Sequence, residues 1–410
     1  GPEEMAKRLH VITTMRQVFM RYGYDTIETP AIEYAETILG KYGDEGDKLT
    51  YTFDDNGGRR IALRYDQTVP TARFVAANWS ELPIPFKRYQ IGPVWRADKP
   101  QRGRYREFYQ CDIDIVGSTS LDADAEIAKV IDDVFTALGV SPFVIRVNSR
   151  ALLDELLELC GVKKADRSPA IRIIDKLDKI SVEAAVKELD ELGLAKKSIS
   201  ALQKHILAEK SRNDVSALPD VKSKKSIQQL FALFKEWGIP DSHIMLDLSL
   251  ARGLDYYTGA IYEVIIPNSG LGSVCGGGRY DNLTGLFSHK VFPGTGVAFG
   301  LDRIMVWLEE QHKLDGLALN SVALVAMFPD VKEANIKTLN ALHKAGINAE
   351  LYLEDAKLQK QFKYADKKRI PWVILQGSEE VKSGNVMLRN MQSGEQEALK
   401  LKDAIERIAV

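Results

Sequence analysis

Cysteine is scarce in this sequence of 410 residues, which contains only Cys111, Cys160 and Cys275. The three are widely separated and no CxxC spacing indicates a zinc site, so we expect no metal-ligating residues. Thiols this sparse are typical of a reducing compartment, and we therefore expect a cytoplasmic protein. We also expect no secretory signal, because none is recognisable near the first residues.

Long hydrophobic runs and a strong charge of one sign are absent as well. The longest apolar runs, such as residues 322–328, fall far short of the roughly 20 residues that span a membrane. Lys and Arg number 55 and Asp and Glu number 57, which leaves a formal net charge of −2. The bulk charge therefore does not indicate a nucleic-acid partner, and any RNA contact must come from local basic patches.

The length and the apolar pattern predict more than one domain, because single cores stop growing beyond roughly 250 to 300 residues. Apolar side chains recur at steps of three and four over residues 3–22, which predicts an amphipathic helix. A glycine-rich segment covers residues 270–278, and residues 294–300 lead into a helix that begins at about Leu301. Other predicted helices cover 67–79 and 122–138, and other predicted strands cover 26–30, 60–65, 244–251 and 260–266.

Two regions differ from this pattern. Strand signals vanish between residues 150 and 243, where Lys-rich helical stretches dominate, and we interpret this region as a mostly helical insertion. After residue 320, strands and helices alternate, which predicts a small α/β domain with a largely parallel sheet. Its predicted strands cover 322–328, 348–353 and 372–375, and its predicted helices cover 332–345 and 357–368.

A predicted β-hairpin carries the most unusual side chains. Strands over 86–96 and 104–116 flank a turn with Pro and Gly. Because strand side chains alternate, one face of the second strand carries two arginines, an aromatic ring, an amide and two carboxylates: Arg104, Arg106, Phe108, Gln110, Asp112 and Asp114. A solvated outer face is the ordinary interpretation. Phe108 and Gln110 between charges, with Arg96 beside the same turn, favour a surface that holds a nucleotide and a polar substrate instead.

Several segments resemble the histidyl-tRNA synthetases, a family of class II aminoacyl-tRNA synthetases. They are RYDQTVP at 64–70, VWR at 94–96, RGRYREFYQCD at 102–112, LARGLDYYTG at 250–259 and SVCGGGRYD at 273–281. A glycine triplet alone is weak, whereas Arg-Gly-Leu-Asp-Tyr-Tyr is specific, and the version here resembles the eukaryotic-type branch. Pro30 sits where the first class II motif has its proline, near a dimer interface. The Gly-Thr-Arg-Asp stretch that relatives usually carry before the first helix does not occur in this sequence.

The resemblance implies an α+β catalytic domain built on an antiparallel sheet, the class II synthetase fold. It would cover residues 1–149 and 244–316, with the helical insertion over 150–243 and an anticodon-binding α/β domain over 321–410. The implied activity is histidine–tRNA ligation: histidine reacts with ATP to give histidyl-adenylate and pyrophosphate, and histidine then passes to the 3′ end of tRNA(His). Mg²⁺ and a homodimer are implied as well.

The resemblance also implies roles for individual residues. The catalytic arginines would be Arg96 and Arg252 at the α-phosphate and Arg303 at the outer phosphates. Histidine would be bound by Asp66, Thr68, Gln110, Asp114, Arg252, Tyr256, Tyr257 and Tyr280. ATP would be bound by Arg96, Asp98, Arg104, Phe108, Gly278 and Arg303, and tRNA by Lys99, Gln101 and Arg102.

Two alternatives stay open at this point. A non-catalytic, histidine-sensing regulatory paralogue would share the catalytic fold, but such proteins typically lack the C-terminal domain and lose catalytic arginines. This sequence keeps Arg96, Arg252, Arg303 and residues 321–410. The lysines and Arg369 between 357 and 369 form a basic cluster for RNA or simply a solvated lysine-rich helix.

Overall fold

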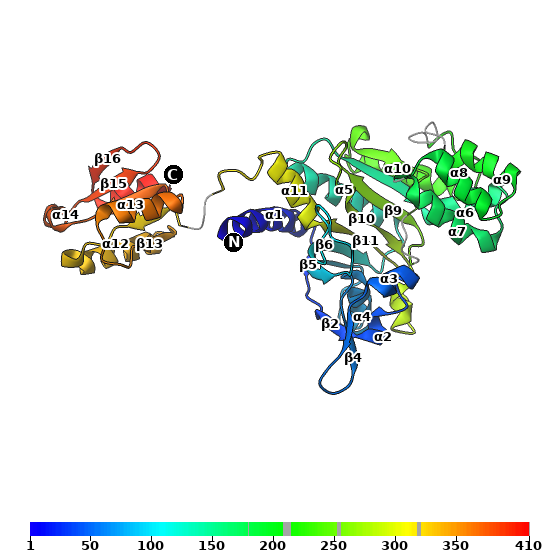
Figure 1. Ribbon diagram of the computed structural model, residues 1–410, viewed down its shortest axis with the longest axis horizontal. Helices are drawn as coiled ribbons and strands as arrows, with labels where there is room; N and C mark the ends of the chain where they lie inside the picture. Colours follow the sequence, from blue (N-terminus) through cyan, green and yellow to red (C-terminus); the bar gives the residue numbers. More distant parts are fainter. Residues whose placement is uncertain (179, 208–214, 252–255, 318–320, 410) are drawn as a thin grey trace. The chain divides into compact units, whose positions relative to one another are not determined.

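A computed structural model describes residues 1–410 apart from 179, 208–214, 252–255, 318–320 and 410. The chain divides into two compact units (Figure 1). One comprises residues 11–313, and the other comprises residues 1–10 and 314–410. No helix of the described residues is long and apolar enough to cross a membrane.

An eight-stranded sheet forms the centre of the larger unit. Its strand order is β1-β5-β6-β11-β10-β9-β7-β8, in which the six inner strands pair antiparallel and only the edge strands β1 and β8 pair parallel. The strands are β1 (Asp25–Thr26), β5 (Phe86–Trp95), β6 (Glu107–Val116), β11 (Gly294–Gly300), β10 (Ser273–Tyr280), β9 (Ala260–Ile265), β7 (Val144–Ser149) and β8 (Ile244–Leu246). The predicted antiparallel sheet and hairpin are therefore confirmed.

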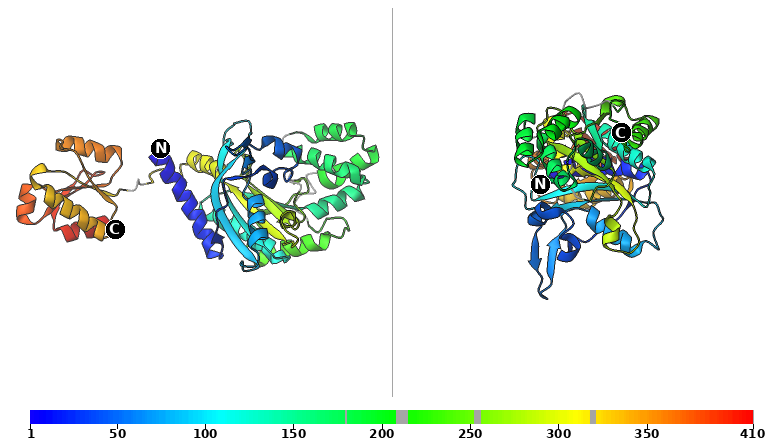
Figure 2. Two further views of the ribbon diagram at one scale, coloured as in Figure 1. Left: turned by 90° about the horizontal axis from the view of Figure 1, so that it is seen from below. Right: turned by 90° about the vertical axis from the view of Figure 1, so that its right-hand side faces the viewer.

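Helices cover one face of this sheet. Phe19 of α1 (Pro2–Arg21) and Phe135 of α5 (Leu121–Ala137) both contact the ring of Phe299 on β11, at centroid distances of 5.8 and 5.9 Å. In Figure 2 the part of α1 that belongs to the larger unit, from residue 11 on, lies along the sheet. Helix α11 (Leu301–Glu310) follows β11 directly. Because side chains alternate, the apolar residues of β6 face these helices and its polar residues face the other side.

A small three-stranded sheet borders the polar side. It consists of β2 (Ile32–Tyr34), β4 (Arg60–Leu63) and β3 (Thr52–Asp54) in that order, and the β3–β4 hairpin projects from the unit in Figure 1. The short helices α2 (Ala35–Ile38) and α3 (Gly43–Leu49) and the longer α4 (Thr68–Asn78) accompany it. Ile38, Ala62 and Val69 share one apolar cluster with Tyr280 of β10, so this cluster ties residues 64–68 to the large sheet.

Five helices follow β7 and gather at one end of the larger unit, drawn mostly in green in Figure 1. They are α6 (Arg150–Leu159), α7 (Lys164–Ile174), α8 (Val182–Glu191), α9 (Lys196–Leu202) and α10 (Lys224–Glu236). Their core of leucine and isoleucine side chains also contains Leu246 of β8 and Leu248 just after it. The helices therefore pack against the end of the sheet.

The smaller unit contains a five-stranded sheet of order β13-β12-β14-β15-β16. The first three strands are parallel, as expected, but β15 and β16 add an antiparallel hairpin that the sequence did not predict. The strands are β12 (Ala323–Val325), β13 (Ala349–Leu351), β14 (Trp372–Leu375), β15 (Val386–Asn390) and β16 (Gln396–Leu399). The helices are α12 (Lys332–Lys344), α13 (Leu358–Lys367), α14 (Ser378–Ser383) and α15 (Leu401–Ala409).

Several predicted boundaries were wrong. The strand expected over 26–30 is limited to the two residues of β1, and the one expected over 244–251 ends at Leu246. The glycine-rich residues 273–280 and 294–300 form two central strands, β10 and β11. Glycine ordinarily weakens a strand, but a Cβ on Gly277 would lie 2.6 Å from the Cα of Val297, so these strands approach too closely for a side chain there.

Helix α6 offers a test of where the insertion gains its stability. Leu156 is 0% exposed in the helical core, whereas Leu159 on the same helix is 54% exposed. We expect Leu156→Ala to lower the free energy of unfolding by about 2 to 5 kcal/mol, because it leaves a cavity, and Leu159→Ala to change it by less than about 0.5 kcal/mol. Thermal denaturation of both variants measures the difference, and equal shifts of the two midpoints would contradict this core.

Candidate active site

Glycines on two neighbouring strands form the floor of the polar face. Gly278 on β10 and Gly294, Gly296 and Gly300 on β11 lie on this side of the sheet. A Cβ on Gly296 would lie 2.5 Å from the Cγ of Asp114, and a Cβ on Gly294 would lie 2.5 Å from the ring of Tyr280. The glycines therefore leave the space into which side chains of the neighbouring strands extend.

Asp114 is held from two sides over this floor. Its Oδ2 accepts from Nη2 of Arg88 on β5 at 2.5 Å, and its Oδ1 accepts from the hydroxyl of Tyr280 on β10 at 2.6 Å. The side chains of Arg88 and Asp114 are 0% and 3% exposed. Burial raises the pKa of Asp114 to about 6, although Arg88 and the Tyr280 hydrogen bond both lower it. The carboxylate is thus fixed in direction and titrates near neutral pH.

Asp66 forms a second carboxylate position, between β4 and α4. Its Oδ1 accepts from the hydroxyl of Tyr42 at 2.9 Å and from the backbone N–H of Val69 at 3.0 Å, and its Oδ2 accepts from the hydroxyl of Tyr256 at 3.5 Å. Burial raises the pKa of Asp66 against these hydrogen bonds. Asp66 is therefore a buried, oriented hydrogen-bond acceptor.

Tyrosine rings connect the two carboxylates. Tyr256 packs edge-on against Tyr257 and Tyr280, at centroid distances of 4.8 and 6.2 Å. A Cβ on Gly278 would lie 3.0 Å from the ring of Tyr257, so that ring lies directly against the glycine floor. Asp66 and Asp114 therefore lie at two ends of one tyrosine-lined site.

Buried polar atoms without a hydrogen-bond partner lie on the same face of β6 as Asp114. Both carboxylate oxygens of Asp112 and Oε1 of Gln110 are buried and have no hydrogen-bond partner among the described residues. Burial raises the pKa of Asp112 well above its usual value. Because buried polar groups are normally hydrogen-bonded, such atoms indicate a place where a polar ligand binds. The solvated face that is ordinary for such a strand is not observed, since Gln110, Asp112 and Asp114 are all buried.

Arg96 is fixed between two aromatic rings at the end of β5. Its guanidinium carbon lies 4.2 Å from the ring centroid of Tyr65 and 5.2 Å from that of Phe108, and its Nε donates to the carbonyl of Tyr65 at 3.0 Å. The contacts hold the guanidinium plane in one orientation. This arrangement presents a positioned cation beside an aromatic face.

The tip of the hairpin is tied to α11. Nε of Arg303 donates to the carbonyl of Gly103 at 3.3 Å and its Nη1 donates to the carbonyl of Ser273. Asp98, in the same turn, accepts from Nη2 of Arg104 at 2.7 Å. Arg303 therefore lies where β10, α11 and the hairpin turn meet.

The residues expected to contact tRNA lie on the exposed part of this turn. Arg102 forms an ion pair with Glu310 and donates to the carbonyl of Ser269 at 3.2 Å. Lys99 and Gln101 are exposed beside it.

The structure brings most of the predicted histidine-binding residues together. Tyr280 contacts Asp114, Tyr256 contacts Asp66, and Tyr257 packs against Tyr256. Gln110 is buried on the same face of β6 as Asp114, and its carbonyl accepts from Nε2 of Gln67 at 3.4 Å. Thr68 begins α4 two residues after Asp66. Arg252 lies outside the described residues. Sequence reasoning missed Arg88, Tyr42 and Gln67, and gave Asp112 no role.

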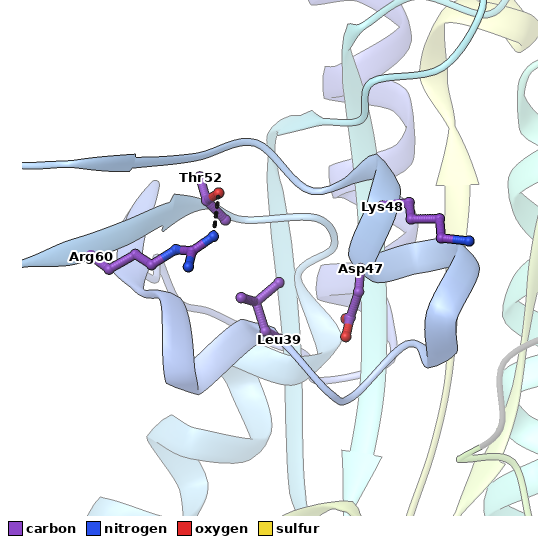
Figure 3. A pocket seen from close by; sticks show the side chains of 5 residues that line it. All are labelled: Leu39, Asp47, Lys48, Thr52 and Arg60. Atoms are coloured by element: carbon purple, nitrogen blue, oxygen red, sulfur yellow. Dashed lines mark hydrogen bonds between the residues drawn. The ribbon is translucent and has the colours of Figure 1, made fainter.

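A separate hollow lies beside the small sheet (Figure 3). It is lined by Leu39, Asp47, Lys48, Thr52 and Arg60, and Nη2 of Arg60 reaches Oγ1 of Thr52 at 3.5 Å. None of the predicted site residues lines it, so it is distinct from the tyrosine-lined site.

Comparisons with known proteins agree with this geometry. The family model described as histidyl-tRNA synthetase matches residues 1–304, and the one described as anticodon binding domain matches residues 321–410.

The histidine–tRNA ligase of Cytophaga hutchinsonii is 39% identical over 100% of this chain and 97% of its own length. That of Bacteroides fragilis is 42% identical over 99% of this chain and 96% of its own length. The crystal structure of histidyl-tRNA synthetase from Nostoc sp. superposes with a TM-score of 0.87 at 31% identity, covering 100% of this chain and 96% of that one. The chain therefore belongs to the histidyl-tRNA synthetase family.

Proposed function

We propose that this chain is a histidine–tRNA ligase, which activates histidine with ATP and transfers it to the 3′ end of tRNA(His). The observation that carries the assignment is the pair of buried carboxylates, Asp66 and Asp114, at two ends of one site. Histidine has an ammonium group and an imidazole ring, and each carboxylate matches one of them.

Asp66, with Thr68 and Gln110, would bind the α-ammonium group. Asp114 would accept a hydrogen bond from one nitrogen of the neutral imidazole, and the hydroxyl of Tyr257 would serve the other. Tyr280 orients Asp114 through the 2.6 Å hydrogen bond. A site built this way rejects analogues without the matching polar atoms by about 10⁴ to 10⁵, because its own buried groups are then left unpaired.

ATP would bind along the hairpin. Phe108 offers a ring for the base, Arg96 lies against that ring and would reach the α-phosphate, and Arg303 would bind the outer phosphates. Asp98, Arg104 and Gly278 complete the proposed ATP contacts, and Arg252, assigned from the family motif, would act at the α-phosphate and the substrate carboxylate.

The chemical step needs no general base, because the histidine carboxylate is already ionised at neutral pH. A carboxylate oxygen bonds to the α-phosphorus while the bond from that phosphorus to the bridging oxygen breaks, which releases pyrophosphate. Arginines fixed before the reaction would align the two groups and stabilise the charge that develops on the phosphate oxygens. The ribose hydroxyl at the 3′ end of tRNA then attacks the acyl carbon of the adenylate and releases AMP.

Mg²⁺ would accompany ATP. Among the described residues no group of three His, Cys, Asp or Glu side chains could hold a metal ion. Mg²⁺ commonly binds through substrate phosphates and retains several waters. When bound, the ion would neutralise phosphate charge beside the arginines.

The tRNA would contact both units. Lys99, Gln101 and Arg102 would meet the acceptor end, where Arg102 would exchange Glu310 for a phosphate. We propose residues 1–149 and 244–316 as the catalytic domain, 150–243 as the insertion and 321–410 as the anticodon-binding domain, in a cytoplasmic enzyme.

The small sheet supports a homodimer. Ile32, Tyr34 and Phe53 are 49%, 51% and 45% exposed, and the register places all three on one face. Exposed apolar side chains that share one face are typical of a protein interface. Pro30 lies two residues before Ile32, where the family resemblance places the dimer contact.

Amino-acid-dependent exchange of labelled pyrophosphate into ATP tests the function. With each of the twenty amino acids in turn, we expect exchange with histidine alone, because only histidine satisfies both carboxylates. Omission of the amino acid is the control. A histidine-sensing protein without ligase activity would give no exchange with any of them, which would contradict the proposal.

The pH dependence tests the role of Asp114. Its pKa is raised to about 6, so the carboxylate loses its charge as the pH falls through that value. The imidazole of free histidine gains a proton near a pKa of about 6.5. We expect kcat/KM for histidine to be level above about pH 7 and to fall at least about tenfold per unit below pH 6. A profile that stays level from pH 8 to pH 5 would show that neither group matters.

The oligomeric state tests the exposed face. Ile32→Glu places a charge in the proposed interface, and we expect it to shift the protein toward the monomer in sedimentation equilibrium. Leu353→Glu, at a position 82% exposed in the smaller unit, is the matched control and should leave the mass unchanged. A wild-type protein that sediments as a monomer would refute the dimer.

A further inference from the structure

The buried arginine on β5 has no role in the chemistry described so far. Arg88 is 0% exposed and lies opposite Asp114 in the sheet register. Its Nη2 contacts Oδ2 of Asp114 at 2.5 Å and also the backbone carbonyl of Gln67 at 3.4 Å. Gln67 stands between Asp66 and Thr68, the residues proposed to bind the ammonium group. One guanidinium therefore touches both ends of the histidine site.

We propose that Arg88 is a positioning residue that determines specificity for histidine: it holds the Asp114 carboxylate and the segment Asp66–Thr68 in one fixed geometry. The inference rests on the proposed function of the same site. The substrate would contact Asp114 and Asp66, and Arg88 would act through them.

Stability alone is a weak reason for this arginine. Removing two charges from water costs several kcal/mol per ion, and a well-packed apolar pair in the same place is often as stable or more so. Moreover, Nε and Nη1 of Arg88 have no hydrogen-bond partner among the described residues. The buried guanidinium therefore lacks hydrogen bonds that would offset its loss of hydration. A requirement to orient Asp114 accounts for the residue better.

The orientation of Asp114 depends on donors from its two sides in the sheet. Arg88 holds Oδ2 from the adjacent strand β5, and Tyr280 holds Oδ1 from β10, across β11, where Gly296 has no side chain between them. Without Arg88, one of these two donors is lost and the carboxylate can rotate toward Tyr280. A lysine would keep a charge but not the rigid, planar guanidinium that directs one nitrogen, Nη2, at both the Asp114 carboxylate and the Gln67 carbonyl.

Arg88 also balances the charges that face Asp114. The nearby carboxylates are Asp112 on the same strand and Asp66 before α4, and the hydroxyl of Tyr280 on β10 is a neutral neighbour. Arg88 lowers the pKa of both Asp112 and Asp114, whereas Asp66 raises the pKa of both and Asp114 raises that of Asp112. Loss of the guanidinium therefore favours a protonated Asp114, which can no longer accept from the imidazole in the same way.

Kinetics of histidine-dependent pyrophosphate exchange test this role in the full-length chain. For Arg88→Met we expect KM for histidine to rise about 10- to 100-fold, the range usual for residues that orient a contacting group. KM for ATP should stay within about threefold, since Arg88 contacts Asp114 and the carbonyl of Gln67, neither of which is a proposed ATP contact. Arg88→Lys should recover part of the loss. The acid limb of kcat/KM for histidine should move to higher pH in Arg88→Met.

Arg146→Met is the matched control. Arg146 is also buried in the large sheet and pairs with Asp247 at 2.8 Å and with Glu263 at 3.0 Å. We expect this variant to lower the thermal midpoint and to leave the acid limb of the histidine profile in place. A shift of that limb in Arg88→Met but not in Arg146→Met separates positioning from general destabilisation.

An unchanged KM for histidine and an unchanged acid limb in Arg88→Met would overturn the inference, as would identical kinetic changes in Arg88→Met and Arg146→Met. If Arg88→Met does not fold, Arg88→Lys decides: a raised KM at a wild-type thermal midpoint supports the role, and a wild-type KM overturns it. Failure of the proposed function is distinguishable, because the wild-type protein would then show no exchange with histidine.

Discussion

The close approach of β10 and β11 is the constraint on which the site depends. Neither strand could lie where it does with a side chain on Gly277, and Asp114 could not extend over β11 with one on Gly296. Glycine has no side chain to pack in the middle of a sheet, so glycines at these positions ordinarily lower its stability. The side chains of Asp114, Tyr280 and Tyr257 extend into the space that the glycines leave, and there they line the proposed binding site.

The two faces of the large sheet have different roles. One face packs against helices and stabilises the fold, and the other carries the side chains of the candidate site. Phe19, Phe135 and Phe299 form an aromatic layer under the floor, and this layer fixes β6 and β11 from behind. On the other face, buried carboxylates such as Asp112 and Asp114 are costly to keep in place. The closely packed apolar face holds the strands in place, so they cannot shift to bring the buried carboxylates into contact with water.

Sequence patterns predicted the hairpin, and the family resemblance implied the antiparallel sheet and assigned the residues of the proposed histidine site. They did not predict Arg88. Pairing residues outward from the expected turn at 98–103 places residue 88 opposite 113, one position from its observed partner, Asp114. Because a one-residue shift moves a side chain to the other face, the sequence could not decide whether Arg88 faces the site. Strands β10 and β11 were missed because their glycine content contradicts strand propensity, and the reason for the glycines is a tertiary contact.

The core of the five insertion helices contains Leu246 of β8, the strand that returns the chain to the sheet, and Leu248 just after it. The insertion is therefore not a separable module attached through a linker. A shortened enzyme that lacked these helices would present both leucines and the end of β8 to water. A smaller catalytic unit would therefore need polar residues in place of the leucines that the helices now cover. The helices and the sheet have to be redesigned together, because they share this core.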